Sequence, residues 1–127
     1  MKKLFGRRPR LSLVVVLYDM AREAPRTLHS LSLAHQQGVA AHDYEVIVVD
    51  NGSPDPPGAA LVEGLQGNFS YLQRSPGDPS PVAAINQGAA RARGKLLGII
   101  IDGARICTPG LVAWALRSHA GFANPVV

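Results

Sequence analysis

Short apolar runs recur along the chain, and polar residues end each of them. Val46–Val49 is an unbroken β-branched run, too short for a helix and apolar on both faces, which predicts a buried parallel strand. Asp50-Asn51-Gly52-Ser53 follows and predicts a turn, because Asn and Gly accept left-handed backbone angles. Similar patterns predict three more strands, over 11–17, 69–73 and 96–101.

Apolar positions at helical spacing separate these strands. They predict a helix from Pro25 toward a stop at Gly38, helices over 59–66 and 82–93, and a final helix after an N-cap at Thr108. Residues 75–81 are mostly Pro, Gly and small polar residues, which indicates a loop. Strands alternating with helices predict an α/β fold, with a mostly parallel four-stranded sheet joined by right-handed crossovers.

The composition fits one folded domain. The chain has 127 residues and 46% apolar residues, and none of its apolar runs approaches the length of a membrane span. The first ten residues lack the apolar core of a signal peptide. Cys107 is the single cysteine, which excludes an internal disulfide and suits a reducing compartment. We therefore expect a cytoplasmic protein.

The net charge of +4 comes from the N-terminal end, where five basic residues occur: Lys2, Lys3, Arg7, Arg8 and Arg10. We expect residues 1–10 to form a basic flexible arm and residues 11–127 to form the folded domain. A solvated terminus is the simplest role for this arm, and contact with the anionic inner face of a membrane is the alternative. Nucleic-acid binding is not expected, because the domain has no second basic cluster and no aromatic platform.

Charged residues follow the predicted strands: Asp19, Asp50, Asp102, Arg74 and Arg105. Parallel strands present their carboxyl ends to the same side, where ligands bind in open α/β sheets. Two readings of Asp50 remain open, since its carboxylate could face a ligand or cap the N–H groups of its own turn. Asp102 and Arg105 could likewise form a structural ion pair. The segment 18–23 contains no glycine, which argues against a dinucleotide-binding fingerprint and a P-loop.

Four segments in order resemble the start of a family 2 glycosyltransferase of the GT-A fold: 11–19, 44–53, the Asn-x-Gly helix of 84–94, and 101–105 with Pro109 behind it. The resemblance implies a site for a nucleotide-diphosphate-sugar in a Rossmann-like half domain. It places Tyr18 and Asp19 against the base, and Asp50 or Asn51 at the base edge. It also turns Asn86 toward the nucleotide and brings Asp102 near the ribose or a diphosphate-bound metal.

The chain departs from that family at its Asp-x-Asp segment, which here reads Asp102-Gly103-Ala104. Because Ala104 cannot ligate a metal, the usual Mg²⁺ or Mn²⁺ site retains Asp102 alone. Arg105 could neutralise the diphosphate instead, since a guanidinium is a permanent cation.

In that family the acceptor site and the catalytic base follow the Asp-x-Asp segment. We therefore expect 11–127 to be a partial domain, truncated before that half, inactive alone and prone to self-association at its apolar edge. The implied reaction is inverting transfer of a sugar to an acceptor hydroxyl, with donor base, sugar, acceptor and catalytic residues unassigned. The alternatives are a non-catalytic nucleotide-binding or assembly module and, less favoured because the glycines are missing, a Rossmann oxidoreductase.

Overall fold

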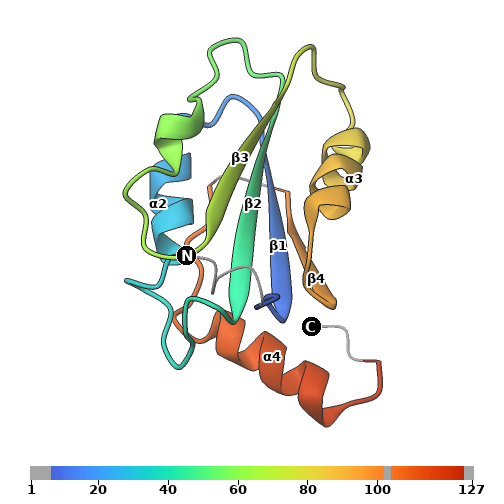
Figure 1. Ribbon diagram of the computed structural model, residues 1–127. Helices are drawn as coiled ribbons and strands as arrows, with labels where there is room; N and C mark the ends of the chain where they lie inside the picture. Colours follow the sequence, from blue (N-terminus) through green and yellow to red (C-terminus); the bar gives the residue numbers. More distant parts are fainter. Residues whose placement is uncertain (1–6, 102–103, 125–127) are drawn as a thin grey trace.

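One four-stranded sheet organises the chain, in the order β3-β2-β1-β4, with every neighbouring pair parallel. A computed structural model describes residues 7–101 and 104–124 (Figure 1). The strands are β1 (Leu11–Leu17), β2 (Tyr44–Asn51), β3 (Phe69–Arg74) and β4 (Leu96–Ile100). The parallel α/β fold predicted from the sequence is therefore confirmed; β1 has the predicted bounds, and the bounds of the other strands differ from the predicted ones by one or two residues.

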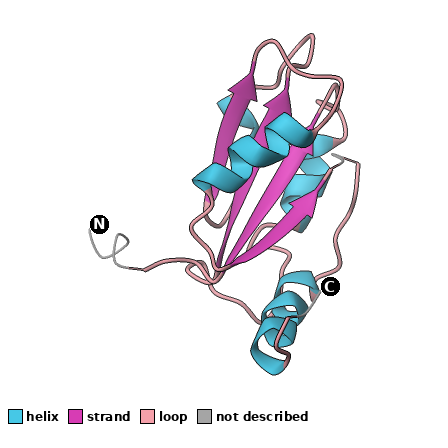
Figure 2. Ribbon diagram, turned by 90° about the vertical axis from the view of Figure 1, so that its right-hand side faces the viewer, coloured by secondary structure: helices cyan, strands magenta, loops and turns pink. Residues whose placement is uncertain are grey.

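Helices cover both faces of the sheet. They are α2 (Ala24–Ser30), the 3₁₀ turn η1 (Ala59–Leu61), α3 (Val82–Arg91) and α4 (Leu111–Gly121). Figure 2 shows α3 in front of the sheet and α2 behind it. Within the described ranges, none of these helices is long and apolar enough to cross a membrane.

The core has two layers because β1 and β2 are apolar on both faces. On one face, Leu13 and Val15 pack with Leu28 of α2 and Val112 of α4. On the other, Val14 packs under α3 with a smaller group: Val16, Ile47, Val49 and Ala84. Each fully buried Val or Leu contributes roughly 1.5–3 kcal/mol, so this double-sided burial favours the central strand position that the sequence pattern predicts.

Gly88 lets α3 approach the sheet. A Cβ added there would lie 2.5 Å from Cγ1 of Val14 and 3.2 Å from Cγ2 of Val49. The glycine of the Asn-x-Gly helix therefore has a packing reason, which is the short distance between α3 and the two central strands.

The first helix is shorter than predicted, ending at Ser30 rather than near Gly38. Polar side chains take up its last carbonyl groups. The Ser30 hydroxyl donates to Thr27 O at 2.6 Å, and the buried Gln36 amide donates to Ser30 O at 2.8 Å. These side-chain bonds compete with the next helical turn, which explains the early stop.

The predicted helix over 59–66 is also wrong beyond its first turn, since only Ala59–Leu61 is helical. Gly64 and Gly67 have φ values of +82° and +125°, which a right-handed helix cannot include.

The N-cap predicted at Thr108 is a further error, because α4 begins after Gly110 and has no side-chain cap on its own segment. The side chain of Gln36, which is distant in the sequence, caps the start of α4 instead. Its Oε1 accepts the N–H of Val112 at 3.1 Å, and its Nε2 donates to Thr108 O at 2.7 Å. One buried amide therefore ties the end of α2 to the start of α4.

A buried polar cluster closes the amino edge of the sheet. Glu45, on β2, accepts hydrogen bonds from Ser12 Oγ at 2.6 Å and from the N–H of Arg93 at 2.8 Å. Ser12 Oγ in turn accepts the N–H of Gly94 at 2.8 Å. The cluster fixes the connection between α3 and β4 against the two central strands.

The described part of the predicted arm contacts the domain. The backbone N–H of Arg10 donates to Asp43 O at 2.9 Å, and Arg7 Nη2 lies 3.3 Å from His42 Nε2. Residues 1–6 lie outside the described residues, and the boundary between arm and domain stays a prediction.

Candidate functional site

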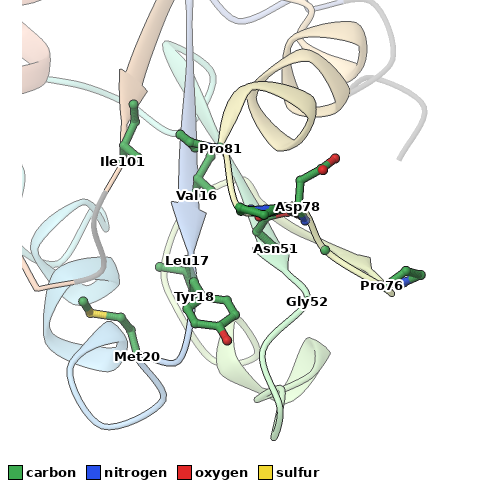
Figure 3. Close-up of a pocket in the computed structure, with 12 residues that line it drawn as sticks. Val16, Leu17, Tyr18, Met20, Asn51, Gly52, Pro76, Asp78, Pro81 and Ile101 are labelled. Atoms are coloured by element: carbon green, nitrogen blue, oxygen red, sulfur yellow. Dashed lines mark hydrogen bonds between the residues drawn. The ribbon is translucent and has the colours of Figure 1, made fainter.

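A pocket of about 850 Å³ opens at the carboxyl edge of the sheet (Figure 3). Three segments far apart in the sequence meet there, as parallel strands require: the end of β1, the turn after β2, and the loop between β3 and α3. The lining residues are Val16, Leu17, Tyr18 and Met20 from the first segment, Asn51 and Gly52 from the second, Pro76, Gly77, Asp78, Pro79 and Pro81 from the third, and Ile101 after β4.

Tyr18 and Asp19, predicted to lie against a base, directly follow β1. Tyr18 lines the pocket and is 55% exposed, so its ring offers a surface to a ligand. Asp19 has a left-handed φ of +53°, a conformation that Asp tolerates better than most residues. Its N–H donates to Ser53 Oγ at 2.8 Å, and Asp19 is not among the residues that line the pocket.

Asp50 is 1% exposed and faces its own turn. Its Oδ1 accepts the N–H of Ser53 at 2.8 Å, and its Oδ2 accepts the Ser53 hydroxyl at 2.7 Å. Through Ser53 the carboxylate is linked to the N–H of Asp19, so it holds the ends of β1 and β2 together. Of the two readings left open by the sequence, the observed contacts match the cap of the turn.

Asn51 lines the pocket, yet its side-chain amide is engaged by the loop between β3 and α3. Its Nδ2 donates to Asp78 O at 3.0 Å and to Ser80 O at 3.3 Å, and its Oδ1 accepts the N–H of Asp78 at 3.3 Å. The residue is 5% exposed. Its amide therefore uses both its donor and its acceptor to hold one wall of the pocket.

Two glycines allow this wall to cross the turn after β2. A Cβ added at Gly77 would overlap the carbonyl oxygen of Asn51, and one added at Gly52 would overlap the backbone nitrogen of Gly77. Gly52 also has a φ of +80°, which side-chain-bearing residues rarely adopt. The backbones touch directly, so this wall has a fixed place relative to β2.

Arg74, at the end of β3, contacts both this loop and α3. Its Nη1 donates to Gln87 Oε1 at 2.9 Å, and its Nη2 lies 3.6 Å from the carboxylate of Asp78. Its Nε is buried without a hydrogen-bond partner among the described residues. Gly77 and Asp78 line the pocket and belong to the site, although the sequence reasoning treated 75–81 only as a loop.

Burial raises the pKa of the Tyr71 hydroxyl, a hydrogen bond from the N–H of Gly58 opposes the rise, and the charge of Asp50 adds to it. The same oxygen accepts the Gly58 N–H at 3.2 Å and donates to Gln73 Oε1 at 3.3 Å. Tyr71 therefore acts as a neutral support for the segment after the Asp50 turn.

The remaining predicted residues are not gathered in the pocket. Asn86 is exposed on α3 and does not line it. Arg105 is exposed and does not line it either. Asp102, predicted as a ribose or metal contact, lies outside the described residues.

The donor set in the described ranges does not fit a metal site, since no group of three His, Cys, Asp or Glu side chains there could hold an ion. Asp78, which lines the pocket, lies 3.6 Å from Arg74, and the Asp50 carboxylate accepts the Ser53 hydroxyl.

Comparison with known proteins identifies related sequences. Residues 12–113 match the model of a family described as Glycosyl transferase family 2. An uncharacterized glycosyltransferase of Mycobacterium tuberculosis, found in two strains, is 31% identical over 113 residues, covering 89% of this chain. The chain spans 41% of the length of those curated relatives.

Solved structures share the fold. S. aureus TarS superposes with a TM-score of 0.76 at 22% identity, covering 87% of this chain and 32% of that one. TarS in complex with UDP-GlcNAc gives a TM-score of 0.76 at 20% identity, covering 87% of this chain and 31% of that one. The mannosyltransferase PcManGT from Pyrobaculum calidifontis, in complex with GDP-Man and Mn²⁺, gives 0.63 at 24% identity, covering 84% and 31%. The predicted GT-A fold is confirmed.

Proposed function

This chain belongs to glycosyl transferase family 2, and we propose that its pocket binds the nucleotide of a nucleotide-diphosphate-sugar donor. The observation that carries the proposal is the pocket of about 850 Å³ at the carboxyl edge of the sheet, where the ends of β1 and β2 meet a fixed loop. Relatives of the same fold bind such molecules, UDP-GlcNAc in TarS and GDP-Man in PcManGT.

The lining of the pocket suits a flat base. Tyr18 offers an exposed ring for stacking, and Leu17 and Val16 add apolar surface beside it. Gly52 and Gly77 also line the pocket, and their lack of side chains lets the loop cross the turn after β2 at this point. In this arrangement Asp50 shapes the turn from inside, while Asn51 lies at the pocket wall.

We propose that the full reaction is the inverting transfer of the sugar to an acceptor hydroxyl, with this chain on the donor side. The curated relatives are more than twice as long as the part matched here. The acceptor contacts and the base that deprotonates the hydroxyl would come from that additional part, so residues 1–127 alone should transfer no sugar.

We propose further that charge from Arg105 supports the donor diphosphate and that binding depends only weakly on Mg²⁺ or Mn²⁺. Ala104 supplies no ligand, and the carboxylates of the described pocket are already engaged. A guanidinium can bind phosphate oxygens with paired, charged hydrogen bonds. Asn86 and Asp102 keep their proposed places on the nucleotide side as predictions from the sequence.

The test is a calorimetric titration of the purified protein with UDP, dTDP, GDP and NAD. We expect nucleoside diphosphates to bind, one of them most tightly, and NAD not to bind. Tyr18→Ala should weaken binding by roughly 1–3 kcal/mol, the scale of base stacking on an aromatic ring. Trp114→Ala, which removes an exposed aromatic on α4 outside the pocket, is the matched control. Equal affinities for all four nucleotides, or none, would refute the proposal.

A contact between two copies of this chain is favoured by β4, which is an edge strand of the described sheet. Leu96 N–H donates to Arg10 O at 3.1 Å, so the backbone groups of the alternate residues Leu97 and Ile99 face away from β1. Their side chains are 42% and 46% exposed, and β4 carries no charge to oppose pairing. We propose that a second copy of this chain pairs antiparallel about Ile99, so that Ile99 faces its own counterpart and Leu97 faces Ile101 of the second copy.

Light scattering tests this contact through the oligomeric state. The wild type should be dimeric, and Ile99→Lys should be monomeric. Ile106→Lys, at an exposed residue away from the strand, should remain dimeric. A monomeric wild type at high concentration contradicts the contact.

The basic arm leads us to propose peripheral attachment to an anionic membrane surface. Five basic residues lie within the first ten positions, and each adds about 1 kcal/mol near such a surface. Co-sedimentation with phosphatidylserine vesicles should exceed that with phosphatidylcholine vesicles, and removal of residues 1–8 should abolish the difference. Equal sedimentation with both vesicle types would contradict this proposal.

A further inference from the structure

One wall of the pocket is formed by the loop segment 76–80, of which residues 76–79 line it. Two contacts described above hold this wall: the glycine crossing, which is the backbone contact of Gly77 with Asn51 and Gly52, and the ion pair with Arg74. The side-chain amide of Asn51 adds three hydrogen bonds to backbone groups of Asp78 and Ser80. The amide is buried at the base of the wall. Its polar atoms are committed to the protein before any ligand arrives.

We propose that Asn51 is a positioning residue, which sets nucleotide affinity by holding the 76–80 wall rather than by contacting the base. The inference rests on the proposed nucleotide site. It follows from the chemistry of the side chain, because the position must donate to two carbonyl oxygens and accept from one N–H. A neutral amide meets both requirements, whereas a carboxylate has no donor and would face two carbonyl oxygens.

The glycine crossing makes the wall sensitive to that amide. Gly77 lies directly on the carbonyl group of Asn51, with no room for a Cβ. If the amide bonds are lost, the wall can move only outward, since the turn after β2 blocks the inward direction. Outward movement widens the pocket and removes Pro76 and Asp78 from its lining. Affinity for every nucleoside diphosphate should then fall by the same factor.

Asn51→Asp is the decisive variant, because it changes the donor and leaves the size of the side chain almost unchanged. At pH 7.5 we expect the backbone amides of Gly77, Asp78 and Ser80, the three residues of 76–80 that are not proline, to exchange hydrogen faster than in the wild type. We expect affinities for UDP and GDP to fall together by about tenfold or more, the scale of one charged hydrogen bond. At about pH 5, protonation of the buried acid restores a donor, and both properties should move back toward wild-type values.

Asn68→Asp is the matched control, since it adds the same charge at an exposed position before β3. Its exchange and affinity should equal those of the wild type at both pH values. Gly77→Ala is the second variant and guards against failure of Asn51→Asp to fold. It displaces the same wall while keeping the amide, so faster exchange and weaker binding should appear without recovery at low pH.

Two results would overturn the inference. One is unchanged exchange over 76–80 in Asn51→Asp, or in Gly77→Ala if the first variant does not fold. The other is loss of affinity for one base alone, which would indicate a direct contact between Asn51 and that base. A wild type that binds no nucleoside diphosphate refutes the proposed function, while the exchange measurement still decides the role of the amide.

Discussion

Replacing Glu45 by Gln should destabilise the fold from the edge opposite to the pocket. The Glu45 side chain is 9% exposed, and its Oε2 accepts hydrogen bonds from both Ser12 Oγ and the N–H of Arg93. Its Oε1 lies 3.3 Å from Nη2 of Arg93. The substitution keeps the shape of the side chain and removes the charge on which all these contacts depend.

The expected loss in the free energy of unfolding is the sum of the losses at the separate contacts. A hydrogen bond to a charged group contributes about 1.5–3 kcal/mol, against about 0.5–1.5 kcal/mol for a neutral one. A Gln at this position can still accept from Ser12 Oγ and Arg93 N–H, so each of these two bonds weakens by about 1–1.5 kcal/mol. The guanidinium of Arg93 is 45% exposed and can turn toward water, so its ion pair adds little. We expect a total loss of about 2–3 kcal/mol in the free energy of unfolding.

Urea denaturation followed by far-UV circular dichroism measures this loss. With a slope of about 1–3 kcal/mol per molar urea, the midpoint should fall by about 0.7–3 M at an unchanged slope. Glu63→Gln is the matched control, because Glu63 is exposed and the change should stay within about 0.5 kcal/mol. Equal midpoints for the two variants would refute the view that the buried cluster stabilises the sheet.

Three further predictions concern other buried or charged groups. Burial raises the pKa of Tyr44 from 10.0 to about 12, so stability from its neutral hydroxyl is present below about pH 10 and lost as pH rises toward 12. Thermal unfolding against pH should show this loss of about 2–3 kcal/mol, and Tyr44→Phe should lack it. Asp50→Ala and Ser53→Ala should each cost about 1–3 kcal/mol in urea unfolding, and the double variant should cost less than the sum of the two, because both remove the bond from the Ser53 hydroxyl to Asp50. Arg105→Ala should weaken nucleoside diphosphate binding in calorimetry by about 1.5–3 kcal/mol, more than excess chelator does to the wild type; the opposite order would indicate a metal.

The order of strands and helices could be predicted because periodicity and burial agree in the central strands. β1 and β2 are apolar on both faces, and a parallel sheet buries both faces. The errors lie where a distant side chain decides the outcome. At the end of α2, Gln36 donates to Ser30 O and Tyr44 OH donates to Leu31 O at 2.6 Å. Gln36 also accepts the N–H of Val112 at the start of α4. No local pattern reports such contacts, so the helix bounds could not be read from the sequence.

The position of the candidate site could be predicted, and the roles of its residues could not. Strand polarity places the ends of β1 and β2 together, which brings Tyr18 and Asn51 to one pocket. Whether a carboxylate at that edge faces a ligand or its own turn depends on the next polar residues. Ser53 lies three positions after Asp50 and offers both an N–H and a hydroxyl, which turn the acid inward. The proline-rich loop gave no periodic signal, yet it contributes five of the residues that line the pocket.

The two edges of the sheet show why only one of them has this pocket. Both carry buried polar side chains, Ser12 and Glu45 at the amino edge and Asp50 and Asn51 at the carboxyl edge. At the amino edge the bonds pull Arg93 and Gly94 onto the strand ends, and the backbone of 93–94 covers them. At the carboxyl edge the amide of Asn51 bonds to the loop backbone at Asp78 and Ser80, while Gly77 of the same loop touches the carbonyl group of Asn51. The same kind of hydrogen bond therefore covers the strand ends at the amino edge and supports a wall of the pocket at the carboxyl edge. The difference depends on which backbone groups the polar side chains reach.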